Sequence, residues 1–111
     1  MIDSYQFGEI VIDGKKYTHH VVISGGTVRK WRTKEGHLLC PDDLADIIKD
    51  KPEVVVIGTG KFGEVRVPQT VLDYARRHSV KVICQVTDEA CRTYNDLTVS
   101  ARVAAALHLT C

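Results

Sequence analysis

The stretch Glu53-Val-Val-Val-Ile-Gly-Thr-Gly60 decides the fold of this chain. Four consecutive β-branched residues, Val54 to Ile57, follow Pro52 and end at a glycine. A short, uninterrupted apolar run between such breakers is typical of a β-strand that is buried on both faces, as in parallel sheets. Because such a strand must be covered from both sides, the rest of the chain has to supply a layer on each face.

The segments downstream predict two strand–helix units. The run Val80-Lys-Val-Ile-Cys-Gln85 has the same apolar character as the first strand, and a helix predicted over Pro68–His78 connects the two. This order predicts a parallel pair joined by a right-handed crossover. A further helix is predicted from Thr87, which we expect to cap it, to Asn95-Asp96. Cys40–Lys49 predicts a short helix before the first strand, with a proline in its first turn.

The first third of the chain predicts an antiparallel meander. The β-rich runs Glu9–Ile12 and Tyr17–Ile23 flank the pair Asp13-Gly14. An Asp-Gly pair between such runs is typical of a hairpin, because both turn positions tolerate positive φ. The segment Thr27–Arg32 mixes polar and apolar residues, as an edge strand does.

The last segment, Thr98–Cys111, fits two structures. Its alanines favour a helix by intrinsic propensity. Apolar residues also recur at every second position, as in a strand that packs one face against a core. These alternating residues are Val103, Ala105, Leu107 and Leu109.

Length and composition predict one globular domain over residues 1–111. Hydrophobic residues at 44% and charged residues at 26% are ordinary for such a domain, and the length is too short for two. The formal net charge of +1 gives no reason to expect nucleic acid or an anionic membrane as a partner. No apolar run approaches the roughly 18 residues that span a bilayer. With no visible signal peptide, we expect a cytoplasmic protein.

Four cysteines are expected to be reduced thiols, because nothing marks the chain as secreted. Cys84 and Cys91 are predicted to be small buried residues of a strand and a helix. Cys111, with His108 nearby in the sequence, is the candidate for a reactive thiol, since a thiolate needs a neighbouring base or cation. Structural closure of the sheet is the alternative for this pair, and it is favoured.

No metal or other cofactor is predicted, because no cysteines or histidines have the paired spacing of a metal site. His19 and His20 are adjacent in a predicted strand and would project to opposite faces. We therefore interpret both as ordinary polar residues of a strand.

The segment Gly58-Thr-Gly-Lys-Phe-Gly63 matches the dinucleotide-binding pattern G-x-G-x-x-G. That pattern binds a pyrophosphate where its loop opens a helix at once, and here Glu64–Val67 intervenes. Turn-forming and close-packing glycines are therefore the favoured interpretation. A ligand, if bound, is expected at the carboxyl ends of the two parallel strands. The candidate ligand contacts are Gly58, Thr59, Gly60 and Thr87.

Several motifs, taken together in their order, resemble a small α/β domain family. They are Val54-Val-Val-Ile-Gly-Thr-Gly60, Val67-Pro68, Thr87, Thr93-Tyr-Asn-Asp-Leu97 and His108-Leu-Thr-Cys111. The family includes the adipogenesis-associated domain-containing protein of animals and the third assembly factor of mitochondrial complex I, alongside many uncharacterised bacterial and archaeal proteins. The resemblance runs from about Glu9 to the last residue.

The resemblance implies an α/β fold of three layers. In it, an N-terminal antiparallel β-hairpin or meander and two βα units lie on a mixed central sheet, which an antiparallel C-terminal strand closes. It therefore implies a strand from about Val103 to Thr110, with the apolar alternate residues on one face and Ala104, Ala106 and His108 on the other. It implies no catalytic residues. The roles it implies are protein assembly, from the complex I branch, and a part in differentiation, from the other branch.

Two hypotheses of function follow. The favoured one is a cytosolic, non-enzymatic domain that binds another protein through aromatic side chains of the N-terminal meander. These candidates are Tyr5, Phe7 and Trp31, and the alternative is that their rings cap the core. The second hypothesis is a small-molecule binder, for an anion or a nucleotide, or an enzyme, with its pocket at the carboxyl ends of the parallel strands. Neither the partner, the ligand nor the oligomeric state follows from the sequence.

Overall fold

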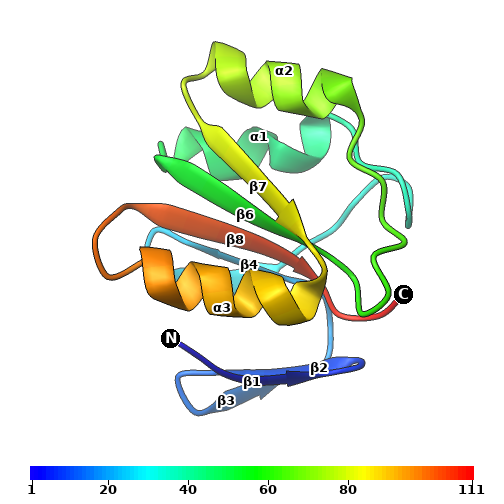
Figure 1. Ribbon diagram of the computed structural model, residues 1–111, viewed down its shortest axis with the longest axis vertical. Helices are drawn as coiled ribbons and strands as arrows, with labels where there is room; N and C mark the ends of the chain where they lie inside the picture. The colour runs from blue at the N-terminus through cyan, green and yellow to red at the C-terminus, as the bar shows by residue number, and fades with distance from the viewer.

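The computed structural model describes residues 1–111, which form eight strands and three helices (Figure 1). A three-stranded sheet contains β1 (Ile2–Gln6), β2 (Glu9–Ile12) and β3 (Lys15–Tyr17). A five-stranded sheet contains β4 (Val21–Ser24), β5 (Thr27–Lys30), β6 (Val54–Thr59), β7 (Lys81–Gln85) and β8 (Val103–His108). The helices are α1 (Asp42–Lys49), α2 (Gln69–Arg77) and α3 (Thr87–Leu97).

The five-stranded sheet is mixed, with the strand order β5-β4-β8-β6-β7. β6 pairs in parallel with both of its neighbours, β7 and β8. Val55, Val56 and Ile57 of β6 expose no surface, so the predicted strand buried on both faces is confirmed. The predicted α/β class, with its antiparallel N-terminal layer, two βα units and mixed central sheet, is also confirmed.

Two apolar layers cover the faces of this sheet. On one face, α1 and α2 pack through Leu44, Ile47 and Val71 against Val55 and Ile57 of β6. On the other face lie α3 and the small sheet, seen together below β8 in Figure 1. The small sheet is joined to α3 by Asn95, whose side chain exchanges two hydrogen bonds of 2.8 Å with the backbone of Ile2. None of the three helices combines the length and the apolar character needed to cross a bilayer.

The last segment is a strand, as the resemblance implies, although its alanines favour a helix. β8 lies between β4 and β6 and is hydrogen-bonded along both edges, which decides the structure against helix propensity. Ala104 and Ala106 pack with α1 and α2, whereas Ala105 and Leu107 pack with α3 and the small sheet. The alternation predicted from the sequence is therefore confirmed.

The direction expected for β8 is right for one neighbour only. β8 runs antiparallel to β4 but parallel to β6, with Val54 opposite Val103. The reason is topological, because α3 carries the chain back across the sheet to the end where β6 begins. The C-terminal strand is thus a parallel member of the sheet on its β6 side.

Two other local predictions are corrected, and the hairpin predicted next to the first of them is confirmed. The run Tyr17–Ile23 is interrupted, because the chain leaves the small sheet after Tyr17 and enters the large sheet at Val21. The predicted hairpin at Asp13-Gly14 is confirmed, with positive φ at both residues. Val80–Gln85 is not a doubly buried strand, since β7 forms an edge of the sheet and Cys84 is exposed on it.

Candidate functional site

The carboxyl ends of β6 and β8 are joined through the hydroxyl of Thr87. This side chain is fully buried, accepts a hydrogen bond from the Gly60 backbone N–H at 2.9 Å and donates one to the His108 carbonyl at 2.7 Å. It was expected to cap α3, but the first turn of α3 has no side-chain cap. Thr87 instead ties α3 to the sheet, and its single hydroxyl proton is already used in the hydrogen bond to His108.

The glycines at this end of β6 are required by close packing. A Cβ on Gly58 would lie 2.8 Å from Thr87 Oγ1 and 2.9 Å from Leu107 Cδ2. A Cβ on Gly60 would collide with the Thr110 carbonyl and lie 2.8 Å from the carbonyl carbon of Cys111. The last residues of the chain therefore cross the place where open α/β sheets bind ligands.

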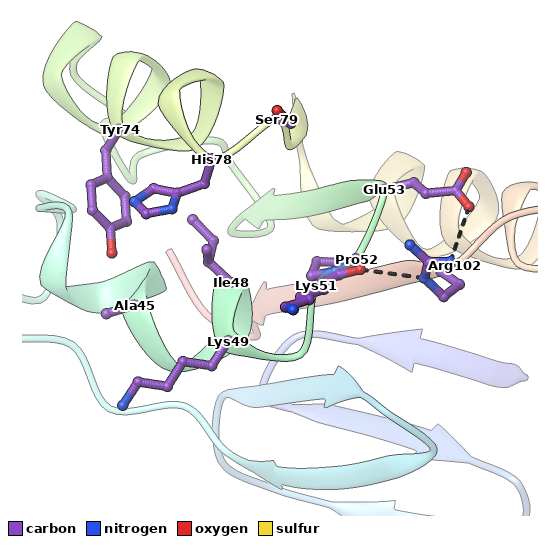
Figure 2. Close-up of a pocket in the computed structure, with 10 residues that line it drawn as sticks. All are labelled: Ala45, Ile48, Lys49, Lys51, Pro52, Glu53, Tyr74, His78, Ser79 and Arg102. Carbon is purple, nitrogen blue, oxygen red and sulfur yellow. Dashed lines mark hydrogen bonds and ion pairs between the residues drawn. The ribbon is translucent and has the colours of Figure 1, made fainter.

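None of the four candidate ligand contacts lines a cavity. Thr59, the remaining candidate, is buried, and its hydroxyl donates a hydrogen bond of 3.1 Å to the Gln85 carbonyl. The largest cavity, of about 590 Å³, lies at the opposite end of the sheet, before β6 and β8 begin (Figure 2). Its Arg102 is ion-paired with Glu53 at 3.7 Å and also donates to the Lys51 carbonyl.

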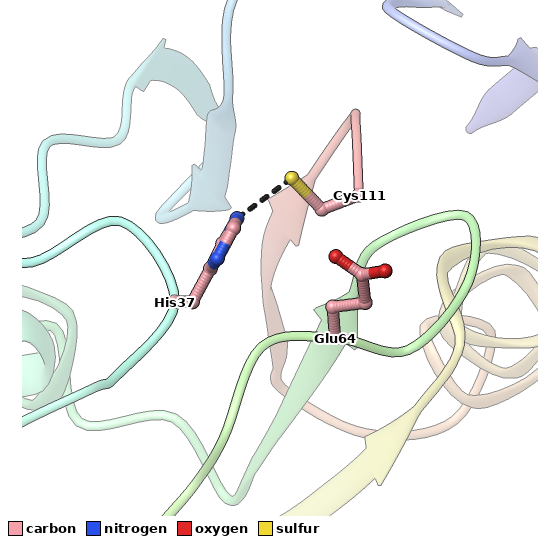
Figure 3. Close-up of side chains that lie close together, drawn as sticks. All are labelled: His37, Glu64 and Cys111. Atoms are coloured by element: carbon pink, nitrogen blue, oxygen red, sulfur yellow. Dashed lines mark hydrogen bonds between the residues drawn. The ribbon is translucent and has the colours of Figure 1, made fainter.

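The thiol of Cys111 lies against a histidine that the sequence did not indicate. His37 Nε2 is 2.8 Å from Cys111 Sγ, whereas His108 Nδ1 donates to the backbone carbonyl of Thr110 at 3.1 Å. The carboxylate of Glu64 completes a group whose three ligand atoms lie within 4.8 Å of one another (Figure 3). The expected pairing of Cys111 with His108 is therefore replaced by a His37–Glu64–Cys111 cluster.

Backbone hydrogen bonds hold the three segments of this cluster together. The segment with His37 forms a parallel bridge to the loop after β6, in which Arg66 N–H donates to the His37 carbonyl at 2.8 Å and Leu39 N–H donates to the Arg66 carbonyl. The same loop donates from Glu64 N–H to the Cys111 carbonyl at 3.3 Å. The cluster is thus positioned by the main chain and not only by its side chains.

Two further histidines stand behind the cluster. His20 stacks on the buried His108 with ring centroids 3.6 Å apart, and His108 meets His37 edge-on at 6.1 Å. The backbone N–H of Leu109 donates to His20 Nδ1 at 2.9 Å, so this nitrogen must be unprotonated. His20 is therefore not an ordinary strand residue but a packed, neutral imidazole.

The stability of the fold is expected to fall in mild acid through His20. Burial, followed by the neighbouring His108 and His19, lowers the pKa of His20 from 6.5 to about 4. Between pH 6.5 and pH 4 the unfolded chain binds more protons at His20 than the folded chain does. The contribution of His20 to stability is therefore fully present above pH 6.5 and is lost as the pH falls through this range. Because His20 is half exposed to solvent, we expect a loss of about 1–2 kcal/mol.

Urea unfolding at pH 7.5, 6.5, 5.5 and 4.5, followed by the fluorescence of the single tryptophan, measures this loss. His20→Gln keeps an acceptor for Leu109 N–H and should flatten the curve between pH 6.5 and 4.5. His78→Gln, at an exposed residue after α2, is the control and should leave the curve unchanged. Equal pH dependence in wild type and His20→Gln would refute the role of His20.

The expected aromatic surface is only partly at the surface. Trp31 is 4% exposed and donates its indole N–H to the Asp43 carbonyl at 3.2 Å. Its ring therefore caps the core, and the prediction that it lies on an interaction surface is wrong. Tyr5 is half-buried and donates its hydroxyl to the Leu109 carbonyl at 2.8 Å. Phe7 is 55% exposed, and its ring lies 6.3 Å from that of Phe62, which is 71% exposed.

The other thiols differ in their surroundings. Cys91 is buried, as predicted, and its burial raises the pKa of the thiol to about 12. This thiol therefore stays protonated at neutral pH. Cys84 is exposed and so does not belong to the core as predicted, whereas Cys40 and Cys111 are half-buried. Among the four cysteines, only Cys111 belongs to a group of potential metal ligands.

Sequence reasoning missed His37, Glu64 and Phe62. His37 precedes α1, and the other two lie in the loop after β6, so no local spacing links them to Cys111. The single sequence signal was the glycine-flanked loop Gly58–Gly63, which marks a place where another backbone approaches closely.

Architecture and site together define a small α/β domain with a mixed sheet. At the carboxyl ends of its parallel strands, where open α/β sheets bind ligands, the space is filled by the last residues of the chain itself. Within that class, residues 2–108 match the model of the family described as "Protein of unknown function (DUF498/DUF598)", and the chain belongs to this family. The predicted resemblance is confirmed.

Named relatives and a solved structure agree with this assignment. The chain is 30% identical to the human protein called NADH dehydrogenase [ubiquinone] 1 alpha subcomplex assembly factor 3 and 32% identical to its mouse counterpart, in each case over 95% of this chain. It spans 58% and 57% of the lengths of these relatives. A conserved hypothetical protein from Pyrococcus horikoshii OT3 superposes with a TM-score of 0.91 at 26% identity, covering 100% of this chain and 99% of that one.

Proposed function

We propose that this chain is a non-enzymatic domain of the cytosol that binds another protein, in the manner of an assembly factor. The observation that carries the proposal is the exposed pair Phe7 and Phe62, contributed by the β1–β2 turn and by the loop after β6. Large aromatic side chains left in water at one place are typical of protein interfaces.

The surroundings of the pair have the composition of an interface rim. Lys61, beside Phe62, is ion-paired with Asp88 at 2.8 Å, and its ammonium lies 5.6 Å from the ring centroid of Tyr5. Apolar residues surrounded by such partly exposed charges resemble the core and rim of a protein–protein contact. The partner is therefore expected to present an apolar side chain to the two rings.

Three further observations support the proposal. The carboxyl ends of the parallel strands offer no cavity to a small molecule, which disfavours the alternative of a ligand-binding or catalytic pocket there. The relatives from human and mouse are named as assembly factors. The four thiols are unpaired, as in a reducing compartment.

Site-specific photo-crosslinking tests the surface directly. With benzoylphenylalanine in place of Phe62, the chain should form a discrete cross-linked product with a protein in cells of the source organism. The matched control carries the same group at Val99, which is 79% exposed and lies between α3 and β8, at the opposite end of the sheet.

The double variant Phe7→Ser, Phe62→Ser should compete for the partner at least about 10-fold less well than wild type, because aromatic residues at an interface centre contribute about 2 kcal/mol or more. Val99→Ser should compete normally. Cross-linking of equal yield from positions 62 and 99, or undiminished competition by the double variant, would remove the pair as a docking surface.

A further inference from the structure

We propose that His37, Glu64 and Cys111 bind a zinc-type divalent transition-metal ion. Each of the three residues offers one ligand atom, and these atoms lie within 4.8 Å of one another (Figure 3). They come from three separate segments: the connection between β5 and α1, the loop after β6, and the residues after β8. This site is distinct from the aromatic pair and goes beyond the proposed binding of a protein.

The kinds of ligand select the metal. An imidazole nitrogen, a thiolate sulfur and a carboxylate oxygen together suit Zn²⁺, whereas Mg²⁺ and Ca²⁺ require oxygen ligands. The thiolate and the carboxylate carry two negative charges, which neutralise the charge of the ion. Three protein ligands leave the fourth tetrahedral position to water, as in zinc sites that remain open to solvent.

The geometry needs side-chain movements of about 1 Å, because ligand atoms that now lie within 4.8 Å of one another must close to about 3.5 Å around a tetrahedral ion. An ion about 2.0–2.1 Å from a nitrogen and about 2.3 Å from a sulfur in a tetrahedral site holds these atoms about 3.5 Å apart. His37 Nε2 and Cys111 Sγ are 2.8 Å apart, so they must separate by about 0.7 Å. His37 and Glu64 are exposed and Cys111 is half-buried, which gives the side chains room to turn and the ion a path from solvent.

The main chain is already arranged for this set. The hydrogen bonds of Arg66 to His37 and to Leu39 fix the first segment against the loop after β6, and the bond from Glu64 N–H to the Cys111 carbonyl fixes the third. Bringing the three ligands together therefore adds little loss of backbone freedom at the moment of binding. Binding must release the thiol proton and any imidazole proton, so affinity should fall as the pH is lowered.

Cobalt and zinc titrations of the tag-free chain, reduced and metal-stripped, test the site. Co²⁺ should bind one ion per chain and give the near-ultraviolet charge-transfer band of a cobalt–thiolate bond, and Zn²⁺ should displace it. Cys111→Ser should abolish the band. His37→Gln and Glu64→Gln should each weaken Zn²⁺ binding at least about 100-fold. Losing a residue that only supports a metal ligand costs about 10–100-fold in affinity, and losing a ligand itself should cost at least as much as the upper end of that range.

The controls are Cys84→Ser and His78→Gln, which remove an exposed thiol and an exposed imidazole elsewhere on the surface. Both should bind Co²⁺ and Zn²⁺ as wild type does. Unfolding curves in the absence of metal show that each variant is folded. The proposal would be overturned if the wild type gave no cobalt–thiolate band. It would also be overturned if the band persisted in Cys111→Ser and was lost in Cys84→Ser.

Discussion

Deleting Ala105–Cys111 is expected to abolish cooperative folding and to leave an aggregating chain. These residues form most of β8, which is hydrogen-bonded to β4 on one edge and to β6 on the other. Their removal would open a gap one strand wide in the middle of the sheet and expose the unpaired, apolar edge of β6, which invites association with other chains.

Lost side-chain burial adds to this effect. Leu107 and Leu109 are fully buried, and truncating a buried leucine costs about 2–5 kcal/mol. The two together approach the whole stability of a typical domain, which is about 5–15 kcal/mol, before any backbone hydrogen bond is counted. The truncated chain therefore has too little remaining interaction to fold.

Soluble yield, size-exclusion chromatography and thermal unfolding measure the result. The matched control lacks only Thr110 and Cys111, and so keeps the whole of β8 and the hydrogen bonds of Leu109 to Gly8 and Tyr5. This control should remain monodisperse and unfold in one sharp transition. A soluble product with a sharp transition from the Ala105–Cys111 deletion would mean that β8 is not the centre of the sheet.

The elements that could be predicted are those whose pattern is local. Val54–Ile57 between breakers indicates a doubly buried strand without knowledge of its neighbours. The alternation in Val103–Leu109 likewise indicates which residues face which layer once a strand is assumed. In both cases, period and length suffice, because the covering layers are large and apolar.

Features that depend on pairing between distant segments could not be predicted. Whether Val80–Gln85 is central or at an edge depends on the strand order, and the exposure of Cys84 follows from it. Trp31 looked like a residue of an exposed strand, but the chain turns there toward α1 and its indole donates to Asp43. No spacing along the chain carries this information.

The candidate site was invisible for the same reason. The sequence predicts that Cys111 is a thiol of interest beside His108, three residues away, whereas the structure places it against His37. β8 ends at His108 and Cys111 has a positive φ of 54°, so the chain leaves the strand direction between the two residues and proximity in sequence is a poor guide to contact. Loops joined by main-chain hydrogen bonds brought His37 and Glu64 to Cys111 instead.

Gly60→Ala is expected to destabilise the fold by about 3 kcal/mol or more. Gly60 has φ of +103°, a conformation that residues with a Cβ rarely adopt. The new Cβ would also collide with the backbone carbonyl of Thr110, which cannot turn away as a side-chain end can. Relief requires the last residues to move, which would strain the hydrogen bonds that the backbone N–H groups of Lys61 and Glu64 donate to the Thr110 and Cys111 carbonyls.

Gly26→Ala separates the two causes, because Gly26 also has positive φ, +79°, but nothing within 4 Å of an added Cβ. It should cost only the conformational strain, about 1–2 kcal/mol. Urea unfolding followed by Trp31 fluorescence gives both free energies, and their difference measures the collision with the last residues. Equal losses for the two variants would show that the chain end is not packed against Gly60. A larger loss for Gly60→Ala would show that the ligand end of this sheet is closed by the chain itself, and Cys111, displaced with Thr110, should then also lose its contact with His37.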